Sequence, residues 1–367
     1  RGIADIVRVV AALVEGLKRR GCEPFLVPAM GSHGGAAPAG QEATLERLGI
    51  TQETVGATIR SQGGVLEVAR TDSGLPVFAD RLAVSADVII PVNRIYTHTN
   101  FSSRVESGLL KMLAVGLGKR QAAESAHRAA LGRGLGEVIM EVGRKALVAL
   151  SVPFGLAIVE NARRQVARIA AIPGESLEEG EADLLQEAKA LKPSIPFDFL
   201  HLLIVDRMGK NVSGTGMDTK VIGRMLQTGE AEPVAPRYLK IYVRDLSPET
   251  GGNAHGMGLA DFISCRLAEK IDIEATLANG LSACAPQRGK RPPVVPSDRE
   301  GIALGLSTSG CDVRSQARIV RIASTRELER LSISGPPREE AEQAGLLIEA
   351  DASPLSFDPA GNLPASL

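Results

Sequence analysis

Residues 197–205 read Phe-Asp-Phe-Leu-His-Leu-Leu-Ile-Val and form the clearest strand signal in the chain. A nearly continuous apolar run of this length is typical of a strand that is buried on both faces of a parallel sheet. We expect the strand to end at Asp206, with a loop rich in Gly, Ser and Thr over 209–216 and a helix over 217–226. Strand, loop and helix in this order predict an α/β fold.

The same order recurs elsewhere in the chain. Residues 238–243 predict a second strand, followed by a glycine-rich loop over 251–258 and a helix over 259–271. In the first half, residues 87–92 (Asp-Val-Ile-Ile-Pro-Val) are expected to form a buried strand that ends at Asn93. Strands that alternate with helices in both halves predict two α/β domains, each with a mainly parallel sheet and flanking helices.

The length of 367 residues also favours two domains. Residues 192–196 (Lys-Pro-Ser-Ile-Pro) are the best candidate for a linker, so we predict a first domain over 1–195 and a second over 196–350. The segment 351–367 contains proline and little apolar periodicity, and we expect it to be a peripheral tail. Because an amphipathic helix starts almost directly after Arg1, we also expect that a segment with a first strand precedes it.

The composition excludes several classes of partner. The 42 basic and 43 acidic side chains almost cancel, and the chain has no Trp and three Tyr, so neither nucleic acid nor an anionic membrane is expected. No apolar run approaches the roughly 18 residues that span a bilayer. None of the four cysteines forms a C-x-x-C pair, which is typical of reduced thiols in a cytoplasmic protein.

Two of the five histidines lie in loops that directly follow predicted strands. His33 lies in Gly-Ser-His-Gly-Gly after a short strand over 24–27, and His98 follows the strand over 87–92. In a parallel sheet both loops open at the same edge, where ligands gather. A single loop histidine is usually structural, but two at equivalent positions can donate and accept protons on opposite sides of one carbon, since imidazole titrates near neutral pH.

A third candidate is Lys111, in the middle of a helix expected over 106–117. A lysine among Leu, Met and Val either extends to solvent or is held for chemistry with a lowered pKa, and the residues alone leave both open. Lys119 is expected to be an exposed cap, His201 a core histidine, and His255 a turn residue with a role in a site as the alternative.

The segments around these residues resemble a known family. Val-Pro-Ala-Met-Gly-Ser-His-Gly-Gly (27–35), His-Thr-Asn-Phe (98–101), Glu-Ser-Gly-Leu-Leu-Lys-Met-Leu (106–113) and the later His127 resemble the nickel-dependent lactate racemase family. They are more similar still to its broad branch of homologues that racemise 2-hydroxy acids. The resemblance extends from the first helix to about residue 350.

The resemblance implies an isomerase with its active site in the cleft between two α/β domains. It implies a nickel-pincer nucleotide (pyridinium-3,5-bisthiocarboxylic acid mononucleotide), made by separate biosynthesis proteins and bound covalently to Lys111. His127 would bind nickel, and His33 and His98 would be the acid/base pair that acts on a 2-hydroxy acid. His127 follows Lys111 by 16 residues (127 − 111), as in the family, whereas the 13 residues from His98 to Lys111 (111 − 98) are slightly more.

One departure concerns the substrate. Ser-His-Gly-Gly (32–35) stands where lactate racemases have a Thr-His-Arg-Pro type motif, so an arginine is missing. Lys210 falls where the second domain of the family presents residues to the substrate, and it could hold a carboxylate as a point charge. An exposed loop lysine is the alternative interpretation.

Two other functions are compatible with the same residues. The first is a zinc or other metal hydrolase that uses His33, His98 and His127, although these lack a short spacing such as H-x-x-x-H. The second is a non-catalytic relative that binds a nucleotide or a partner protein.

Overall fold

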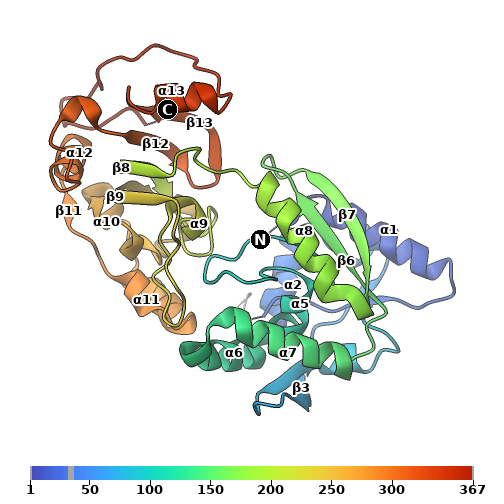
Figure 1. Ribbon diagram of the computed structural model, residues 1–367. Helices are drawn as coiled ribbons and strands as arrows, with labels where there is room; N and C mark the ends of the chain where they lie inside the picture. Colours follow the sequence, from blue (N-terminus) through green and yellow to red (C-terminus); the bar gives the residue numbers. More distant parts are fainter. Residues whose placement is uncertain (1, 32–36, 366–367) are drawn as a thin grey trace. The chain divides into compact units, whose positions relative to one another are not determined.

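The computed structural model describes residues 2–31 and 37–365 (Figure 1). The chain divides into two compact units, Arg1–Lys192 and Pro193–Leu367, whose boundary falls in the proline-containing segment 192–196. Both units contain sheets and helices, so the predicted α/β class is confirmed. None of the helices that these residues form has the length and apolar character needed to cross a membrane.

The strands of the first unit belong to three small sheets. β1 and β2 pair in parallel, β3 and β4 form an antiparallel hairpin, and the third sheet has the order β5-β6-β7. In that sheet β5 and β6 are parallel, whereas β6 and β7 form a second hairpin. The prediction of one mainly parallel sheet for this half is therefore wrong, because the described residues of the unit form three small sheets with both parallel and antiparallel strand pairs. The strands are β1 (Phe25–Leu26), β2 (Thr58–Ile59), β3 (Val65–Arg70), β4 (Pro76–Asp80), β5 (Val92–Arg94), β6 (Phe154–Glu160) and β7 (Val166–Pro173).

The predicted buried strand over 87–92 is wrong except at its last residue. β5 begins at Val92, and Val88 is 46% exposed. The segment before β5 follows β6 only loosely, since Ile89 N–H bonds the carbonyl of Ser151 and the Pro91 carbonyl accepts from Leu156. β5 is an edge strand, and the proline before it has no N–H to donate.

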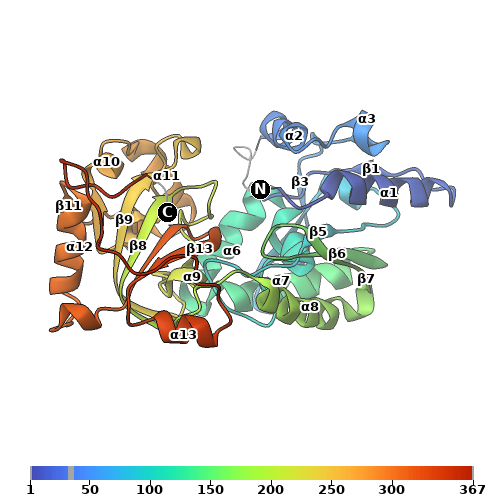
Figure 2. The same ribbon diagram turned by 90° about the horizontal axis from the view of Figure 1, so that it is seen from above.

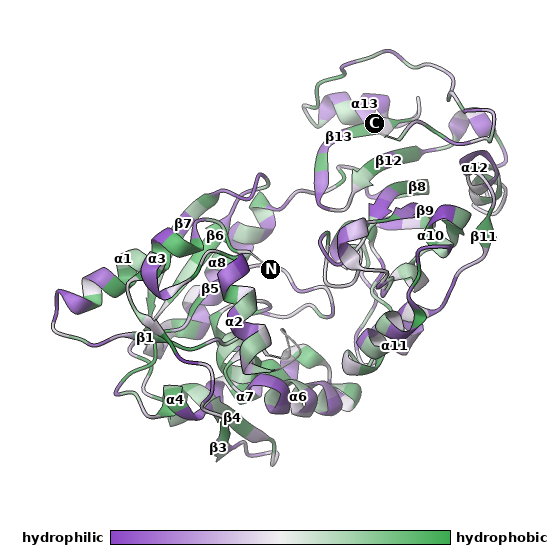
Figure 3. Cartoon of the chain, turned by 180° about the vertical axis from the view of Figure 1, so that it is seen from behind, coloured by the Kyte–Doolittle hydropathy of each residue, from purple (hydrophilic) through white to green (hydrophobic). Residues whose placement is uncertain are grey.

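The helices of the first unit carry most of its core. α1 is amphipathic: Val9, Val10 and Val14 are buried, and green and purple residues alternate along it in Figure 3. α5 lies among α7, α8 and the β5–β6 pair, with its first two residues fully buried. The helices are α1 (Ile6–Lys18), α2 (Pro38–Arg47), α3 (Gln52–Val55), α4 (Arg81–Val84), α5 (Leu109–Lys111), the π-helical turn η2 (Met112–Gly116), α6 (Lys119–Arg133), α7 (Leu135–Ala149) and α8 (Leu177–Leu191).

The second unit is built on one sheet of order β11-β10-β9-β8-β12-β13 (Figure 2). All neighbouring pairs are parallel except β12 and β13. Both faces are apolar, because Leu202 and Ile204 pack on the side of α12 while Leu203 and Val205 pack on the opposite side. The strands are β8 (Phe199–Met208), β9 (Arg237–Leu246), β10 (Phe262–Ser264), β11 (Val294–Val295), β12 (Ile319–Ser324) and β13 (Glu327–Ile333).

Both long helices predicted after β8 and β9 are shorter in the structure. The first is reduced to α9 (Thr219–Ile222), which Asp218 caps and Gly223, at φ 66°, terminates. The second is replaced by β10 and the single turn α10 (Cys265–Ala268). The remaining helices are α11 (Ile273–Ser282), α12 (Asp298–Ser307) and α13 (Arg338–Gln343).

The segment 351–367, expected to be peripheral, contributes to the core of the second unit at Leu363, which is 5% exposed. Arg244 on β9 and Asp298 on α12 form a buried ion pair of 2.7 Å, and both also bond the backbone of Leu363. Arg321 on β12 donates to the carbonyl of Pro364. The buried charges of the sheet therefore hold the tail in place.

Candidate functional site

His98 lies in the loop that follows β5. Its backbone N–H donates to Glu106 Oε2 (2.7 Å), and its ring stacks on Phe101 with 4.6 Å between the centroids. The ring nitrogen Nδ1 accepts the N–H of Asn100 at 3.0 Å. An imidazole that accepts at Nδ1 carries its proton on Nε2 when it is neutral, so this conformation makes His98 a donor at Nε2.

The same loop is closed at its base. Asn93 Nδ2 donates to the carbonyl of Gly108 at 2.9 Å, and Tyr96 and Ser107 exchange backbone hydrogen bonds. Glu106 is 1% exposed and lies 3.2 Å from Lys189 Nζ on α8. His98 and the start of α5 are therefore parts of one fixed structure.

Lys111 is the last residue of α5. The helix expected over 106–117 begins only at Leu109, and the residues directly after Lys111 form a π-helical turn, η2. Such turns are rare and frequently occur at functional sites. Lys111 is partly buried.

His127 lies on α6, near enough to Lys111 for the two to interact electrostatically. Burial, which is the larger cause, and the positive charge of Lys111 together lower the pKa of His127 to about 4. His127 is thus neutral at physiological pH, and a ring nitrogen retains the electron pair that a metal ion needs. The structure brings together the two residues that the resemblance assigns to the cofactor.

The junction between η2 and α6 is fixed by Lys119, which we expected to be an exposed cap. Its side chain is buried, and Nζ lies 2.6 Å from Asp80 Oδ2 and 2.9 Å from the carbonyl of Ser61. The residue adopts a left-handed φ of 52°. A buried ion pair therefore ties the start of α6 to the end of β4.

The loop that leads to His33 packs on η2. Gly31 N–H bonds the carbonyl of Gly116 at 3.2 Å, and the buried Gln41 donates to the carbonyl of Gly31. A β-carbon on Gly116 would lie 2.5 Å from the carbonyl oxygen of Ala29, so the close approach requires glycine. His33 itself lies outside the described residues.

Lys210 lies in the second unit, in the loop that follows β8. Its Nζ donates to the carbonyl of Gly214 at 2.7 Å, and its backbone N–H donates to Thr250 in the loop after β9. The side chain is partly buried, so the interpretation as an exposed loop lysine is wrong.

His255, in the loop after β9, has surroundings that the sequence did not indicate. It is 1% exposed, and its pKa is lowered to about 4 by burial, by Lys210 and by Arg288. The two glycine-rich loops interlock, because a β-carbon on Gly256 would overlap the carbonyl of Thr215. The motif Gly-Gly-Asn-Ala-His-Gly at a strand end was the available signal. By contrast His201 accepts the N–H of Arg318, as expected of a structural histidine.

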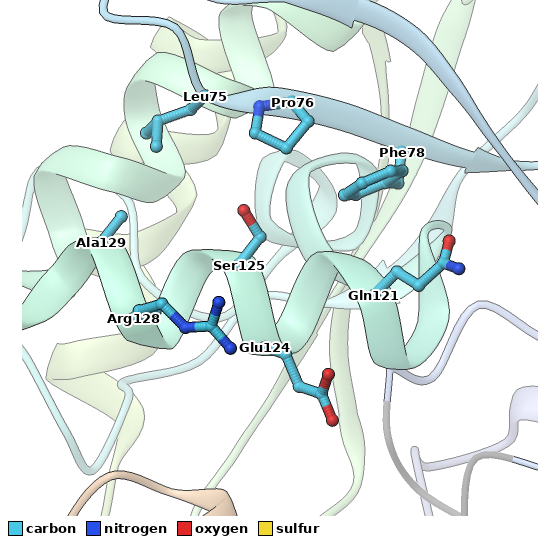
Figure 4. Close-up of a pocket in the computed structure, with 8 residues that line it drawn as sticks. All are labelled: Leu75, Pro76, Phe78, Gln121, Glu124, Ser125, Arg128 and Ala129. Atoms are coloured by element: carbon cyan, nitrogen blue, oxygen red, sulfur yellow. The ribbon is translucent and has the colours of Figure 1, made fainter.

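A depression of about 520 Å³ lies between the hairpin β3–β4 and α6 (Figure 4). Residues 121, 124, 125 and 128 of α6 line it and share one face of the helix. His127 lies on a different face, so the depression is not part of the Lys111–His127 site.

No group of three or more His, Cys, Asp or Glu side chains within residues 2–31 and 37–365 is arranged to hold a metal ion. A metal with most of its ligands on an organic cofactor needs fewer protein ligands, and His127 alone could serve.

The fold is that of a lactate racemase-like α/β protein. Among solved structures, the lactate racemase apoprotein from Thermoanaerobacterium thermosaccharolyticum is similar with a TM-score of 0.51 and 12% identity, over 88% of this chain and 82% of that one. A protein from Thermotoga maritima is similar with a TM-score of 0.51 and 13% identity, over 89% and 90% of the two chains. No family model and no curated protein matches the sequence.

Proposed function

We propose that this protein is a racemase or epimerase of a 2-hydroxy acid that uses a nickel-pincer nucleotide attached to Lys111. The observation that carries the proposal is the pairing of Lys111 with His127, whose pKa is lowered to about 4 by burial and by the charge of that lysine. The similarity to the lactate racemase apoprotein supports it at the level of the fold. Production of the cofactor by separate biosynthesis proteins and a cytoplasmic location belong to the same proposal.

The residues present fit such a cofactor. Lys111 offers an amine for covalent attachment, and the neutral imidazole of His127 is a common type of ligand for nickel. The partial burial of both side chains would limit the access of water to the bound group. When bound, the nucleotide supplies an electrophilic carbon that can accept hydride from C2 of the substrate.

The histidines of the chain would handle the proton of the substrate hydroxyl. Removing the α-hydrogen of a hydroxy acid as a proton is difficult for imidazole, since each unit of pKa mismatch costs about 1.4 kcal/mol. With Nε2 protonated, His98 would donate to the substrate oxygen. To accept the substrate proton at Nε2, His98 must carry its own proton on Nδ1 instead. Nδ1 then no longer accepts the N–H of Asn100. His33 would be the partner on the other face, and Lys210 would hold the carboxylate.

The test is the intact mass and nickel content of the protein, produced together with cofactor-making enzymes. We expect an adduct that maps to Lys111, bound nickel, and loss of both in Lys111→Ala but not in Lys290→Ala, an exposed lysine. Unmodified, nickel-free protein from cells that load a control racemase would contradict the proposal.

One equivalent of zinc, with activity lost to a chelator and restored by zinc, would instead indicate a hydrolase that uses His33, His98 and His127. Unchanged properties in His33→Ala and His98→Ala would indicate a non-catalytic binding protein.

A further inference from the structure

The start of α5, two residues before Lys111, is buried. Leu109 and Leu110 are both 0% exposed, and the first hydrogen bond inside the helix runs from Met112 N–H to the carbonyl of Gly108. The earlier N–H groups of a helix have no partner within it and are costly when water cannot reach them. The residue at the N-cap position is Gly108, which has no side chain to accept them.

The missing acceptor comes from α8, far along the chain. Glu181 Oε2 accepts the N–H of Leu110 at 2.8 Å, and the carboxyl also interacts with the N–H of Leu109. Burial raises the pKa of Glu181 to about 7, even though these two N–H groups act to lower it. The two N–H groups favour the carboxylate but do not offset the cost of its burial.

The turn before α5 is shaped around this carboxyl. A β-carbon on Gly108 would overlap Glu181 Oε1 and lie 2.9 Å from Ile95 Cδ1. On the other side, Asn93 from β5 holds the carbonyl of Gly108 at 2.9 Å. β5 and α8 therefore fix the same peptide, and the first turn of α5 depends on their packing.

The arrangement costs stability, which a purely structural cap would avoid. Glu181 Oε1 is buried and has no hydrogen-bond partner among the described residues. Helices are usually capped by a neighbouring Ser, Thr, Asp or Asn, without burying a distant carboxyl. α5 contains just three residues before the π-helical turn, so a weak first turn would release Lys111.

We propose that Glu181 is a positioning residue for Lys111: by holding the first turn of α5, it keeps the lysine amine beside His127. This inference rests on the proposed function, because that function is what makes the position of Lys111 important. The contact between Glu181 and α5 is nevertheless present in the protein without cofactor. It assigns Glu181 no contact with substrate.

The test uses the full chain without cofactor and three variants: Glu181→Ala, Glu181→Gln, and Glu178→Gln as control. Glu178 lies one turn earlier on α8, is 8% exposed, and accepts hydrogen bonds from Arg144 and Arg104. The rate at which an acylating reagent labels Lys111 is measured by peptide mass spectrometry. The pKa of His127 is measured by NMR. Melting curves report whether each variant is folded.

We expect Glu181→Ala to increase labelling of Lys111 about tenfold, the size of a lost N-cap. The pKa of His127 should rise, because the positive charge of Lys111 would move away. Glu181→Gln should give a smaller increase, since its amide oxygen still accepts a hydrogen bond, and Glu178→Gln should match the wild type. A folded Glu181→Ala protein with unchanged labelling and an unchanged His127 pKa would overturn the inference.

If Glu181→Ala does not fold, Gly108→Ala decides, because its methyl group displaces the carboxyl while leaving it in the chain. Increased labelling then supports the inference, and unchanged labelling contradicts it. Failure of the proposed function can be told apart from failure of this inference. If wild-type protein produced with the cofactor-making enzymes carries no cofactor on Lys111, the proposed function is wrong. The labelling rates of Lys111 in the variants without cofactor still test the role of Glu181.

Discussion

The two units hold their candidate site residues by different means. In the first, Lys111 and His127 lie on helices whose placement depends on buried ionisable side chains, Glu181 at the start of α5 and Lys119 at the start of α6. In the second, Lys210 and His255 lie in loops after strands, and a glycine of each loop packs on a backbone carbonyl of the other. The first unit should therefore respond to changes of charge and pH, and the second to added volume.

The largest effect is expected at the buried ion pair of Lys119 and Asp80 in the first unit. Lys119→Met leaves Asp80 buried without its cation, and breaking one side of such a pair costs about 3–5 kcal/mol. Denaturant unfolding should show this loss, and Asp80→Asn combined with Lys119→Met should recover part of it. Equal stability of Lys119→Met and the wild type would mean that charge does not hold this junction.

A pH-dependent effect is expected at Glu181. Burial raises its folded pKa to about 7 from the ordinary value of 4.5 for a glutamate, so the native state binds the proton more tightly. That contribution is fully present below pH 4.5 and is lost as the pH rises to about 7. Glu181→Gln does not ionise, so its stability relative to the wild type should increase by about 2–3 kcal/mol between pH 4.5 and 8. A difference that stays constant over this range would show that the carboxyl is not strained.

A comparable loss from volume alone is expected in the second unit. Gly256 has a φ of 106°, and a methyl group there would overlap the carbonyl of Thr215, so Gly256→Ala should cost about 2 kcal/mol. Gly251→Ala is the matched control, because Gly251 also has a positive φ but has no atom within 4 Å of the added carbon. Similar melting temperatures for both variants would mean that strain, not interlocking of the loops, sets the cost.

The smallest effect concerns the charge shared by Lys111 and His127. Lys111→Ala should raise the pKa of His127 above about 4, because the neighbouring positive charge disappears. The rise should be modest, since burial is the larger cause of the lowered value. An NMR titration of the histidine ring measures it, and a pKa that stays unchanged would place the two side chains too far apart to interact.

The sequence predicted what depends on local pattern. β8 (Phe199–Met208) contains most of the apolar run 197–205, although it continues past Asp206, where the strand was expected to end. Both glycine-rich loops follow strands of the sheet of the second unit. The quoted motifs pointed to Lys111 and His127, and the charge of Lys111 acts on the pKa of His127 in the structure. Each of these predictions needed only neighbours in the chain or the quoted motifs.

What the sequence did not predict depends on partners far apart in the chain. Glu181 reaches Leu110 across 71 positions, and Lys119 reaches Ser61 across 58. The apolar periodicity of a helix does not predict which of its side chains will pack against a glycine far away in the chain, as Glu181 packs against Gly108. The strand expected over 87–92 failed for a related reason: an apolar composition cannot distinguish a central strand from a segment at the edge of a sheet.

The buried charges of the second unit also bear on the order in which it can be completed. Arg244 and Arg321 lie on two central strands, yet both bond backbone carbonyls at residues 363 and 364. During synthesis these arginines emerge from the ribosome well before that segment does. The network can form only after residues 363 and 364 have also emerged from the ribosome. Until then, Arg244 on β9 and Arg321 on β12 lack these two hydrogen bonds.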